Sequence, residues 1–207
     1  MINVLLVEDK KMSRECLEGY IAASGRYTLA ASISNAGMAE MTCMRYPVDI
    51  ILMDVCTENN ESGLVAAAGI KRKMPEIKIV VVTSMMDSSF LQKAKQAGAE
   101  SFWYKESSPE ELLTVMDRTM LGESVYPDKA PEVQIGNTTS AEFTPGDLAV
   151  LRLLVKGFTD AAIAGELHIS VSAVRWHIKE LFEKTGYTNR VTLACDVINK
   201  DLIVPGF

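Results

Sequence analysis

The chain has 207 residues, of which 48% are hydrophobic and 23% charged, and its formal net charge is −6. This composition is ordinary for a globular protein of one large or two small domains, and it excludes a chain that is basic throughout. No apolar run reaches the ~18 residues of a membrane span. The start lacks the basic lead of a signal peptide, and the four cysteines show no Cys-x-x-Cys spacing. We therefore expect a cytoplasmic protein with reduced thiols rather than a disulfide or zinc framework.

The first 120 residues alternate between short apolar runs and amphipathic stretches of helical length. The apolar runs are 2–7, 27–33, 48–53, 77–82 and 101–104, and the helical stretches are 12–23, 36–45, 64–73, 88–97 and 110–121. Strands that alternate with helices predict a parallel sheet with helices on both faces. Ser108, Pro109 and Glu111 predict a capping box at the start of the last helix.

The pattern changes after residue 121. Residues 122–142 contain Pro, Gly and the run "NTTS" without helical periodicity, which is typical of a linker. From Thr144, an N-cap followed by Pro145, the remaining sequence reads as helices. We predict one domain over 1–121, a linker over 122–142 and a second domain over 143–207. Residues 141–207 hold seven Lys or Arg and eight Asp or Glu, a net charge of −1.

Polar residues stand at the carboxyl ends of four predicted strands. They are Glu8 and Asp9, Asp54, Thr83 and Ser84, and Lys105. Functional residues of an open parallel sheet gather at these ends, so the three acids should lie together. Crowded carboxylates recruit a cation, and Mg²⁺ prefers such oxygen ligands.

An aspartate in such a cluster can act as a nucleophile and form an aspartyl phosphate. Phosphoryl transfer depends chiefly on positioning and charge neutralisation, which Mg²⁺ and Lys105 would supply. Thr83 would donate a hydrogen bond to a phosphoryl oxygen, and the small Ser84 would leave an approach path. Each residue alone has a common structural explanation as a loop, cap or solvated residue. The alternative for the set is a flavodoxin-like fold with an incidental acidic rim.

The stretches "VLLVEDK", "DIILMD", "IVVVTS" and "GAESFWYK" make residues 1–121 resemble a response-regulator receiver domain. The resemblance implies a flavodoxin-like (βα)5 doubly wound fold. It also implies roles: Asp54 is the phosphoacceptor, Glu8 and Asp9 are the acidic pair, and Asp9 is the more direct Mg²⁺ ligand. The remaining positions are the switch hydroxyl Thr83 with its neighbour Ser84, the phosphate-binding Lys105 and the switch aromatic Phe102. A phenylalanine at such a position is usually a core residue. Only its place three residues before Lys105 supports Phe102 as the switch aromatic.

The loop after Asp54 departs from the receiver pattern. Receivers usually have Met-Pro soon after the aspartate and Gly about eight residues on, whereas here the stretch is "DVCTENNESG" and Gly63 comes at nine. The backbone carbonyl of Cys56 would complete the metal site by the same resemblance. A longer loop with Glu58 and Glu61 is expected to alter metal affinity or the lifetime of the phosphate.

Residues 158–190 read as two helices with a short break, and Ser170 caps the second. At about 100° per residue, one sector of this second helix faces the core: Val171, Val174, Ile178 and Leu181. The opposite side presents Ser172, Arg175, Trp176 and Lys179. A tryptophan beside two cations suits a recognition helix in a DNA major groove. The alternative is an amphipathic helix with a solvated basic face, which the net charge of −1 favours.

The stretch "FTPGDLAVLRLLVKGFTDAAIAGELHISVSAVRWHIKELFEKTGYTNR" resembles the LuxR-type helix-turn-helix that ends NarL/FixJ-type response regulators. By this resemblance the outward residues Ser172, Arg175, Trp176 and Lys179 contact DNA. The departures are Gly146-Asp147, Ala173 and Thr185. Trp176 is bulkier than the residue expected there, so the DNA sequence it reads should be unusual.

Together the resemblances imply a transcriptional response regulator rather than an enzyme, apart from catalysis of its own phosphorylation and dephosphorylation. A histidine kinase would phosphorylate Asp54, Thr83 would move toward the phosphate, and Phe102 would turn inward. The activated form would bind double-stranded DNA as a homodimer. The altered loop after Asp54 keeps a phosphorylation-independent DNA-binding regulator open as an alternative. An enzyme on a flavodoxin-like fold is a third, which leaves the helix-turn-helix unexplained.

Overall fold

The computed structural model describes residues 1–105 and 108–203, without the side chains of residues 109 and 110. It divides into two units. The first comprises Met1–Ser84 and Ser88–Lys129, and the second comprises Met85–Asp87 and Ala130–Phe207. None of the helices in the described ranges is both long and apolar enough to cross a bilayer.

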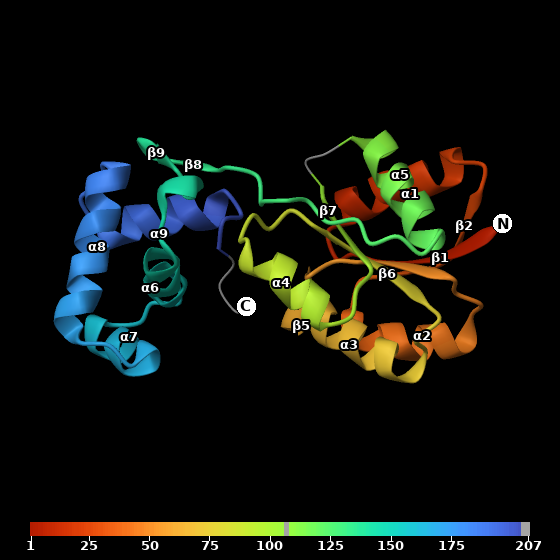
Figure 1. The fold of residues 1–207 in the computed structure, drawn as a ribbon, viewed down its shortest axis with the longest axis horizontal. Helices are drawn as coiled ribbons and strands as arrows, with labels where there is room; N and C mark the ends of the chain where they lie inside the picture. Colours follow the sequence, from red (N-terminus) through yellow and green to blue (C-terminus); the bar gives the residue numbers. More distant parts are fainter. Residues whose placement is uncertain (106–107, 204–207) are drawn as a thin grey trace. The chain divides into compact units, whose positions relative to one another are not determined.

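The first unit is built on a parallel sheet of five strands, as far as the described residues show (Figure 1). In spatial order the strands are β2 (Tyr27–Ile33), β1 (Ile2–Val7), β3 (Ile50–Met53), β6 (Lys78–Thr83) and β7 (Ser101–Tyr104). The side chains of β3 and β7 are buried throughout, because helices cover both faces of the sheet. The strand order reverses between β1 and β3, which makes their carboxyl ends the expected ligand site. The predicted fold class is confirmed.

Two layers of helices cover this sheet (Figure 1). One layer holds α1 (Lys11–Ala23) and α5 (Pro109–Met120), whose apolar residues pack into the core with β1, β3 and β6. The other holds α2 (Ala39–Arg45), extended at its start by a 3₁₀ turn (Ala36–Met38), α3 (Gly63–Lys73) and α4 (Ser89–Gln96). The predicted capping box is present at α5, where Ser108 accepts from the backbone of Glu111 and Glu111 accepts from that of Ser108.

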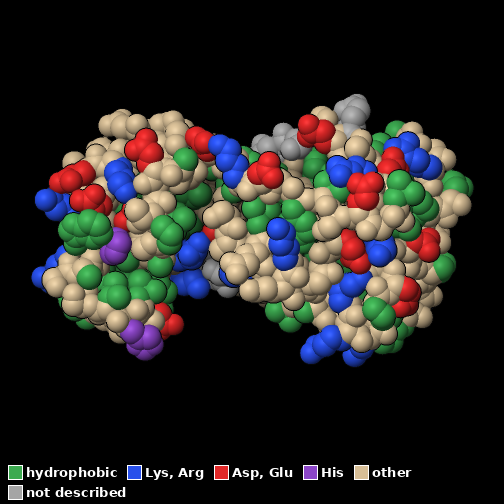
Figure 2. Space-filling view, viewed as in Figure 1, with side chains coloured by type: hydrophobic (Ala, Val, Ile, Leu, Met, Phe, Trp, Pro, Cys, Tyr) green, Lys and Arg blue, Asp and Glu red, His purple; other side chains and the backbone are tan. Residues whose placement is uncertain are grey.

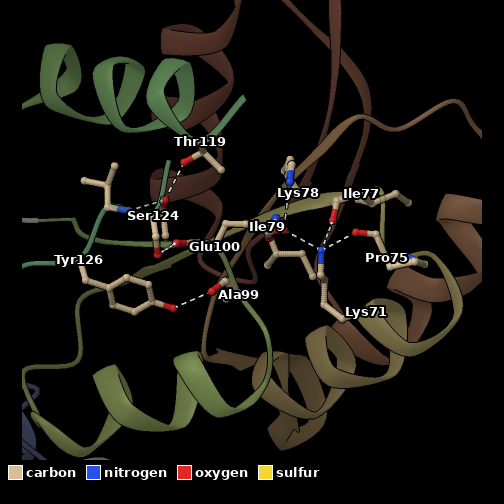
Figure 3. A network of polar contacts seen from close by, with 12 residues as sticks. Lys71, Pro75, Ile77, Lys78, Ile79, Ala99, Glu100, Thr119, Ser124 and Tyr126 are labelled. Carbon is tan, nitrogen blue, oxygen red and sulfur yellow. Dashed lines mark hydrogen bonds and ion pairs between the residues drawn. The ribbon is translucent and has the colours of Figure 1, made fainter. Parts of the chain in front are cut away.

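A polar network fixes the start of β7 (Figure 3). The Glu100 carboxylate accepts hydrogen bonds from the Ile79 backbone N–H at 2.9 Å and from Lys71 Nζ at 2.7 Å. On the other side, Ser124 Oγ donates to the Glu100 carbonyl at 2.7 Å, and the Tyr126 hydroxyl donates to the Ala99 carbonyl at 2.8 Å. These bonds set the register of β7 against β6 and so place the residue at its carboxyl end.

The second unit is helical. Its helices are α6 (Pro145–Val155), α7 (Asp160–Leu167), α8 (Val171–Thr185) and α9 (Arg190–Asn199). The predicted caps are present, because the side chains of Thr144 and Ser170 accept from backbone N–H groups of α6 and α8. Thr159 caps α7 in the same way. Met85–Asp87 belong to this unit, and the Asp87 carboxylate accepts two hydrogen bonds of 2.7 Å from the Arg152 guanidinium.

Secondary structure is also present within 122–142, the range predicted to be a linker. A hairpin forms from β8 (Gln134–Ile135) and β9 (Thr138–Thr139), and a 3₁₀ turn follows (Ser140–Glu142). The hairpin turn lies against the end of α8, where the Asn137 N–H donates to the Thr185 carbonyl at 2.9 Å. A Cβ on Gly136 would lie 2.1 Å from that carbonyl oxygen, so the contact requires glycine. Two-residue strands are too short to give the alternating pattern from which strands are recognised.

Candidate functional site

The strand pairing brings the predicted acids together. Val7 and Met53 are register partners of β1 and β3, and the Asp54 N–H donates to the Val7 carbonyl at 3.0 Å. Glu8 and Asp54 therefore leave neighbouring strands at the same edge, where both are buried. Carboxylate oxygens of Glu8, Asp9 and Asp54 all lie within 4.8 Å of one another.

Lys105 lies between two of these acids. Its Nζ is 2.7 Å from Asp54 Oδ2 and also forms an ion pair with Glu8 Oε2. The position follows from β7, which ends at Tyr104, and from the Lys105 N–H, which donates to the Thr83 carbonyl at 3.0 Å. Glu8 also accepts from the Lys10 N–H at 3.0 Å. Lys105 thus pairs with two of the three carboxylates, and Asp9 has no ion pair within the part of the chain that the structure describes.

This environment changes the acidity of the Asp54 carboxyl. Burial raises the pKa of Asp54 to about 7; Lys105 opposes the rise, and the nearby charge of Glu8 adds to it. Burial alone would lower the pKa of Lys105, but the carboxylates of Asp54 and Glu8 outweigh it and raise that pKa. Burial thus works against the ionised form of Asp54, and the Lys105 ammonium works for it.

The other residues predicted for the site lie on or directly after β6 and β7. Thr83 ends β6 and is fully buried, and Ser84 follows it in a half-buried position. Phe102 lies inside the unit at 1% exposure, with its ring 4.9 Å from that of Tyr104 in an edge-to-face arrangement. The structure thus holds Phe102 in an inward position.

The segment after Asp54 is a hairpin, where the sequence predicted only a longer loop. Strands β4 (Cys56–Thr57) and β5 (Glu61–Ser62) pair antiparallel around a turn in which Asn59 and Asn60 have positive φ. Ser34 Oγ donates to Glu58 Oε2 at 2.6 Å, which anchors the turn to the end of β2. Burial raises the pKa of the Cys56 thiol to about 11, and the Asp54 and Asp9 charges add to this effect, so Cys56 lies beside the acids.

Gly63 permits the close approach of α3 to the end of β3, a role that its spacing alone did not reveal. A Cβ at this position would lie 1.8 Å from the Asp54 carbonyl oxygen, which is backbone and cannot move aside. We predict that Gly63→Ala lowers the stability of the first unit by roughly 1–3 kcal/mol, the range for overpacking. Thermal unfolding followed by fluorescence of the buried Trp103 measures it.

Gly19→Ala is the matched control for this substitution. Gly19 lies within α1, and a Cβ there meets nothing within 4 Å. Alanine in a helix interior is favoured over glycine by about 1 kcal/mol, so this change should raise the melting temperature. A Gly63→Ala protein as stable as the wild type would show that the close approach at Asp54 has been misread.

The acids suit a hard divalent cation. Three carboxylates within 4.8 Å offer oxygen ligands, and a cation among them would favour the ionised form of the buried Asp54 carboxyl. Glu8 is already engaged by Lys105, Lys10 and Ser13, whereas Asp9 makes no hydrogen bond or ion pair with the rest of the described chain. The donor set therefore fits Mg²⁺, with Asp9 as the ligand least committed elsewhere.

The outward face of α8 is exposed as predicted. Val174 and Leu181 are fully buried, while the opposite face exposes Ser172, Arg175, Trp176 and Lys179. Trp176 is 54% exposed. Arg175 lies 3.4 Å from Asp160 and Lys179 lies 3.3 Å from Glu183, and such exposed pairs are weak enough for a phosphate to replace. On the face seen in Figure 2, acidic and basic side chains are interspersed over each unit. This face therefore shows no large basic surface among the described residues.

A buried ionic cluster holds the inner side of α8. The Asp147 carboxylate, 1% exposed, lies 2.8 Å from Lys184 Nζ and 2.8 Å from His177 Nδ1, and it accepts from the Thr144 N–H at 3.0 Å. A Cβ on Gly146 would lie 2.5 Å from the His177 ring. The departure Gly146-Asp147 therefore has a structural reason: glycine makes room for the ring and Asp147 binds it.

Asp147 should make the second unit acid-sensitive. Burial opposes ionisation, but hydrogen bonds from Lys184, His177 and Thr144 prevail and lower the pKa of Asp147 from 3.8 to about 2. A lowered pKa stabilises the fold above pH 4, and this contribution of about 2 kcal/mol is lost as the pH falls from about 4 to 2.

We expect Asp147→Asn to be less stable at pH 7 and the difference to shrink below pH 4. Urea unfolding followed by Trp176 fluorescence in a Trp103→Phe background measures this. Exposed Glu166→Gln is the control, and a pH-independent difference would contradict the account.

Two protein families match this chain. The response regulator receiver domain matches residues 4–117, and the LuxR family of bacterial regulatory proteins matches residues 141–197. The response regulator protein VraR of Staphylococcus aureus is 26% identical over 207 residues, which cover 98% of this chain and 99% of VraR.

Solved structures show the same folds. A LuxR-family two-component response regulator from Aurantimonas sp. SI85-9A1 is 27% identical, with a TM-score of 0.56 over 59% of this chain and 87% of that one. The response regulator RcsB in a complex with DNA has a TM-score of 0.63 at 18% identity, over 95% of this chain and 97% of that one. The receiver match alone spans more than half of the residues, and the LuxR match covers most of the second unit. The chain belongs to the response regulators, as a receiver domain followed by a DNA-binding domain of the LuxR family.

Proposed function

We propose that Mg²⁺-dependent phosphorylation of Asp54 by a partner histidine kinase switches this regulator between two states of DNA affinity. The observation that supports this most directly is the Asp54 carboxylate, buried at 5% exposure and 2.7 Å from Lys105 Nζ, in a cluster of three acids. A buried nucleophile beside a cation and oxygen ligands is what phosphoryl transfer needs.

In the proposed reaction an ionised Asp54 oxygen attacks the phosphorus of the kinase phosphohistidine. An O–P bond forms, the N–P bond breaks, and the imidazole leaves with the bonding electrons and takes up a proton from water. Bound Mg²⁺ would neutralise charge on the carboxylates and on the phosphoryl oxygens. Lys105, which now pairs with Asp54, is placed to follow the new charge onto a phosphoryl oxygen.

Transmission is proposed to begin at Thr83, whose hydroxyl would turn toward the phosphoryl group. Thr83 stands two residues before Met85–Asp87, which belong to the second unit. A movement of Thr83 therefore has a short covalent path to the DNA-binding unit. The charge change at Asp54 would bias a two-state element in this way. Phe102 already lies inward, so the inward turn that the sequence predicted would require little movement.

Double-stranded DNA and a second copy of the chain are the proposed ligands of the active form. Structures of RcsB are described as dimers bound to DNA. A homodimer here would place two α8 helices on two half-sites, with Ser172, Arg175, Trp176 and Lys179 facing the groove. A regulator of this kind acts in the cytoplasm, and its only chemistry is the gain and loss of its own phosphoryl group.

The second candidate is a DNA-binding regulator that works without phosphorylation. The observation that favours it is the β4–β5 hairpin, because a structured insertion beside Cys56 replaces the usual loop at the metal site. The two candidates differ in one property: whether phosphorylation of Asp54 changes the affinity for DNA.

Lys105→Ala tests the proposed switch. Asp54 is retained, so the variant should still take up phosphate from acetyl phosphate, but more slowly, because the carboxylate loses the ammonium that favours its ionised form. The phosphorylated variant should not gain DNA affinity, since no ammonium links the phosphate to β7. Lys78→Ala, at the other end of the neighbouring strand β6, is the control. Intact mass and a DNA titration measure both steps, and DNA binding by phosphorylated Lys105→Ala at the strength of phosphorylated wild type would refute the role of Lys105.

A further inference from the structure

The outer face of α2 is apolar. Met38, Met41 and Met44 are 46%, 57% and 65% exposed, and Tyr46 follows at 39%. Four of the thirteen large hydrophobic side chains exposed in the described ranges therefore fall within nine consecutive residues. A surface helix normally turns polar residues outward, and a contiguous apolar face indicates an interaction site. Methionine is common on such surfaces, because its flexible thioether adapts to a partner.

The three methionines are arranged symmetrically. Ala39 and Cys43 are buried and define the inner side of the helix. At about 100° per residue, Met41 points away from them, and Met38 and Met44 lie about 60° to either side of Met41. The backbone of Met38 (φ −90°, ψ −8°) is close enough to helical for the 3₁₀ turn to continue this face. The stripe formed by Met38, Met41 and Met44 is therefore symmetric about Met41. Two copies of it can pack against each other in an antiparallel arrangement.

Opposite charges stand at the two ends of the stripe. Arg45 is exposed at the carboxyl end, where its guanidinium lies 5.5 Å from the Tyr46 ring centroid. Glu61 of β5 lies at the other end, because a Cβ on Gly37 would be 3.7 Å from Glu61 Oε2. Neither Arg45 nor Glu61 forms an ion pair within the part of the chain that the structure describes. In an antiparallel pair centred on Met41, Arg45 of one copy faces Gly37 and Glu61 of the other.

We propose that this α2 face is a two-fold contact with a second copy of the chain. Met41 meets its own counterpart, Met38 meets Met44 of the other copy, and Arg45 pairs with Glu61 of the other copy. A two-fold interface must be self-complementary, which the symmetric stripe and the opposite end charges satisfy. This inference rests on the homodimer proposed above and identifies the surface through which the two copies meet. A pair of short helices buries little area, so the dimer is weak in solution. It strengthens when DNA holds two copies side by side, since binding then becomes intramolecular.

Engineered cysteines test the register of this contact. In a full-length Cys16→Ser, Cys195→Ser background, which removes the two exposed thiols, Met41→Cys should form a disulfide-linked dimer under mild oxidation. Met38→Cys and Met44→Cys should link poorly alone, because each lies away from the two-fold axis. A mixture of these two variants should give the mixed dimer, since a disulfide needs Cα atoms within about 7 Å. Equal linking by all three single variants, or none by Met41→Cys, would overturn the proposal.

A charge exchange tests the ion pair independently. Arg45→Glu and Glu61→Arg should each raise the dimer dissociation constant, measured by sedimentation, roughly 2–30-fold, since two exposed pairs are lost per dimer. The double variant should regain most of the wild-type affinity because the pairs re-form with reversed sign. Trp103 fluorescence in the folded protein checks that each variant retains the first unit. If the losses of dimer affinity add up in the double variant while sedimentation still detects dimers, this face is not the contact. The homodimer itself would then form through another surface.

Discussion

Wild-type protein incubated with acetyl phosphate and Mg²⁺ should gain the mass of one phosphoryl group, and Asp54→Asn should gain none. The asparagine keeps the shape of the side chain but lacks the carboxylate that attacks phosphorus. Chelation of Mg²⁺ should suppress labelling of the wild type, because the acid cluster then retains its excess negative charge. Asp49→Asn is the matched control: Asp49 precedes the other end of β3, where it accepts a hydrogen bond from the Asn3 N–H. Intact mass spectrometry measures the gain, and equal labelling of wild type and Asp54→Asn would disprove the assignment of Asp54.

The same assay separates the two remaining acids. Asp9→Asn should weaken Mg²⁺ binding more than Glu8→Gln does, because Glu8 is already occupied by Lys105 and by the N–H of Lys10. Titration of Mg²⁺ at fixed acetyl phosphate gives the concentration for half-maximal labelling of each variant. The reverse order would mean that the roles of Glu8 and Asp9 are exchanged.

Removing outward side chains of α8 should weaken DNA binding without unfolding the second unit. Arg175→Ala should cost roughly 1–3 kcal/mol at one base position and relax the preference there, as expected for a base-edge contact. Lys179→Ala should weaken binding to all sequences alike and reduce the salt slope by about one unit, as expected for a phosphate contact. Trp176, 54% exposed, should matter more for a selected duplex than for a scrambled one.

Substitutions on the inner and outer faces of α8 should separate effects on folding stability from effects on DNA binding. Val174→Ala removes a fully buried side chain and should cost about 1–3 kcal/mol of folding stability, whereas the outward changes should leave unfolding unaltered. Lys156→Ala, an exposed cation at the end of α6, controls for the loss of one charge. Titrations of the full chain with both duplexes at several salt concentrations measure the effects. If all three outward variants bind both duplexes like wild type, the basic face of α8 is only solvated surface.

The sequence predicted that the acids lie together because the elements that carry them are regular. A buried parallel strand gives an unbroken apolar run, so the first polar residue after each run marks the sheet edge. Glu8, Asp54 and Lys105 were found in this way. Their arrangement was not predictable, because a strand end does not reveal which side chain will reach between two others. The ion pairs of Lys105 with both acids emerge only when β1, β3 and β7 are assembled.

The two hairpins escaped prediction for a physical reason. Strands of two residues bury too little to show a pattern, and they depend on tertiary anchors: Glu58 on Ser34 for one, and Asn137 on Thr185 for the other. The role of Asp147 was likewise hidden, since the residue was noticed only as a departure from the LuxR pattern. Its partners His177 and Lys184 lie 30 and 37 residues away, and local patterns do not reveal such contacts.

Phosphate on Asp54 is expected to change the affinity for DNA, and one titration measures this change. A selected duplex is titrated with wild-type protein before and after treatment with acetyl phosphate and Mg²⁺, and with treated Asp54→Asn. We predict that treatment raises the affinity of the wild type alone, by roughly 5–150-fold if the coupling is of the usual 1–3 kcal/mol. Equal affinity in all three samples, with wild-type labelling verified by mass, would contradict the switch and identify a regulator that binds DNA independently of phosphorylation.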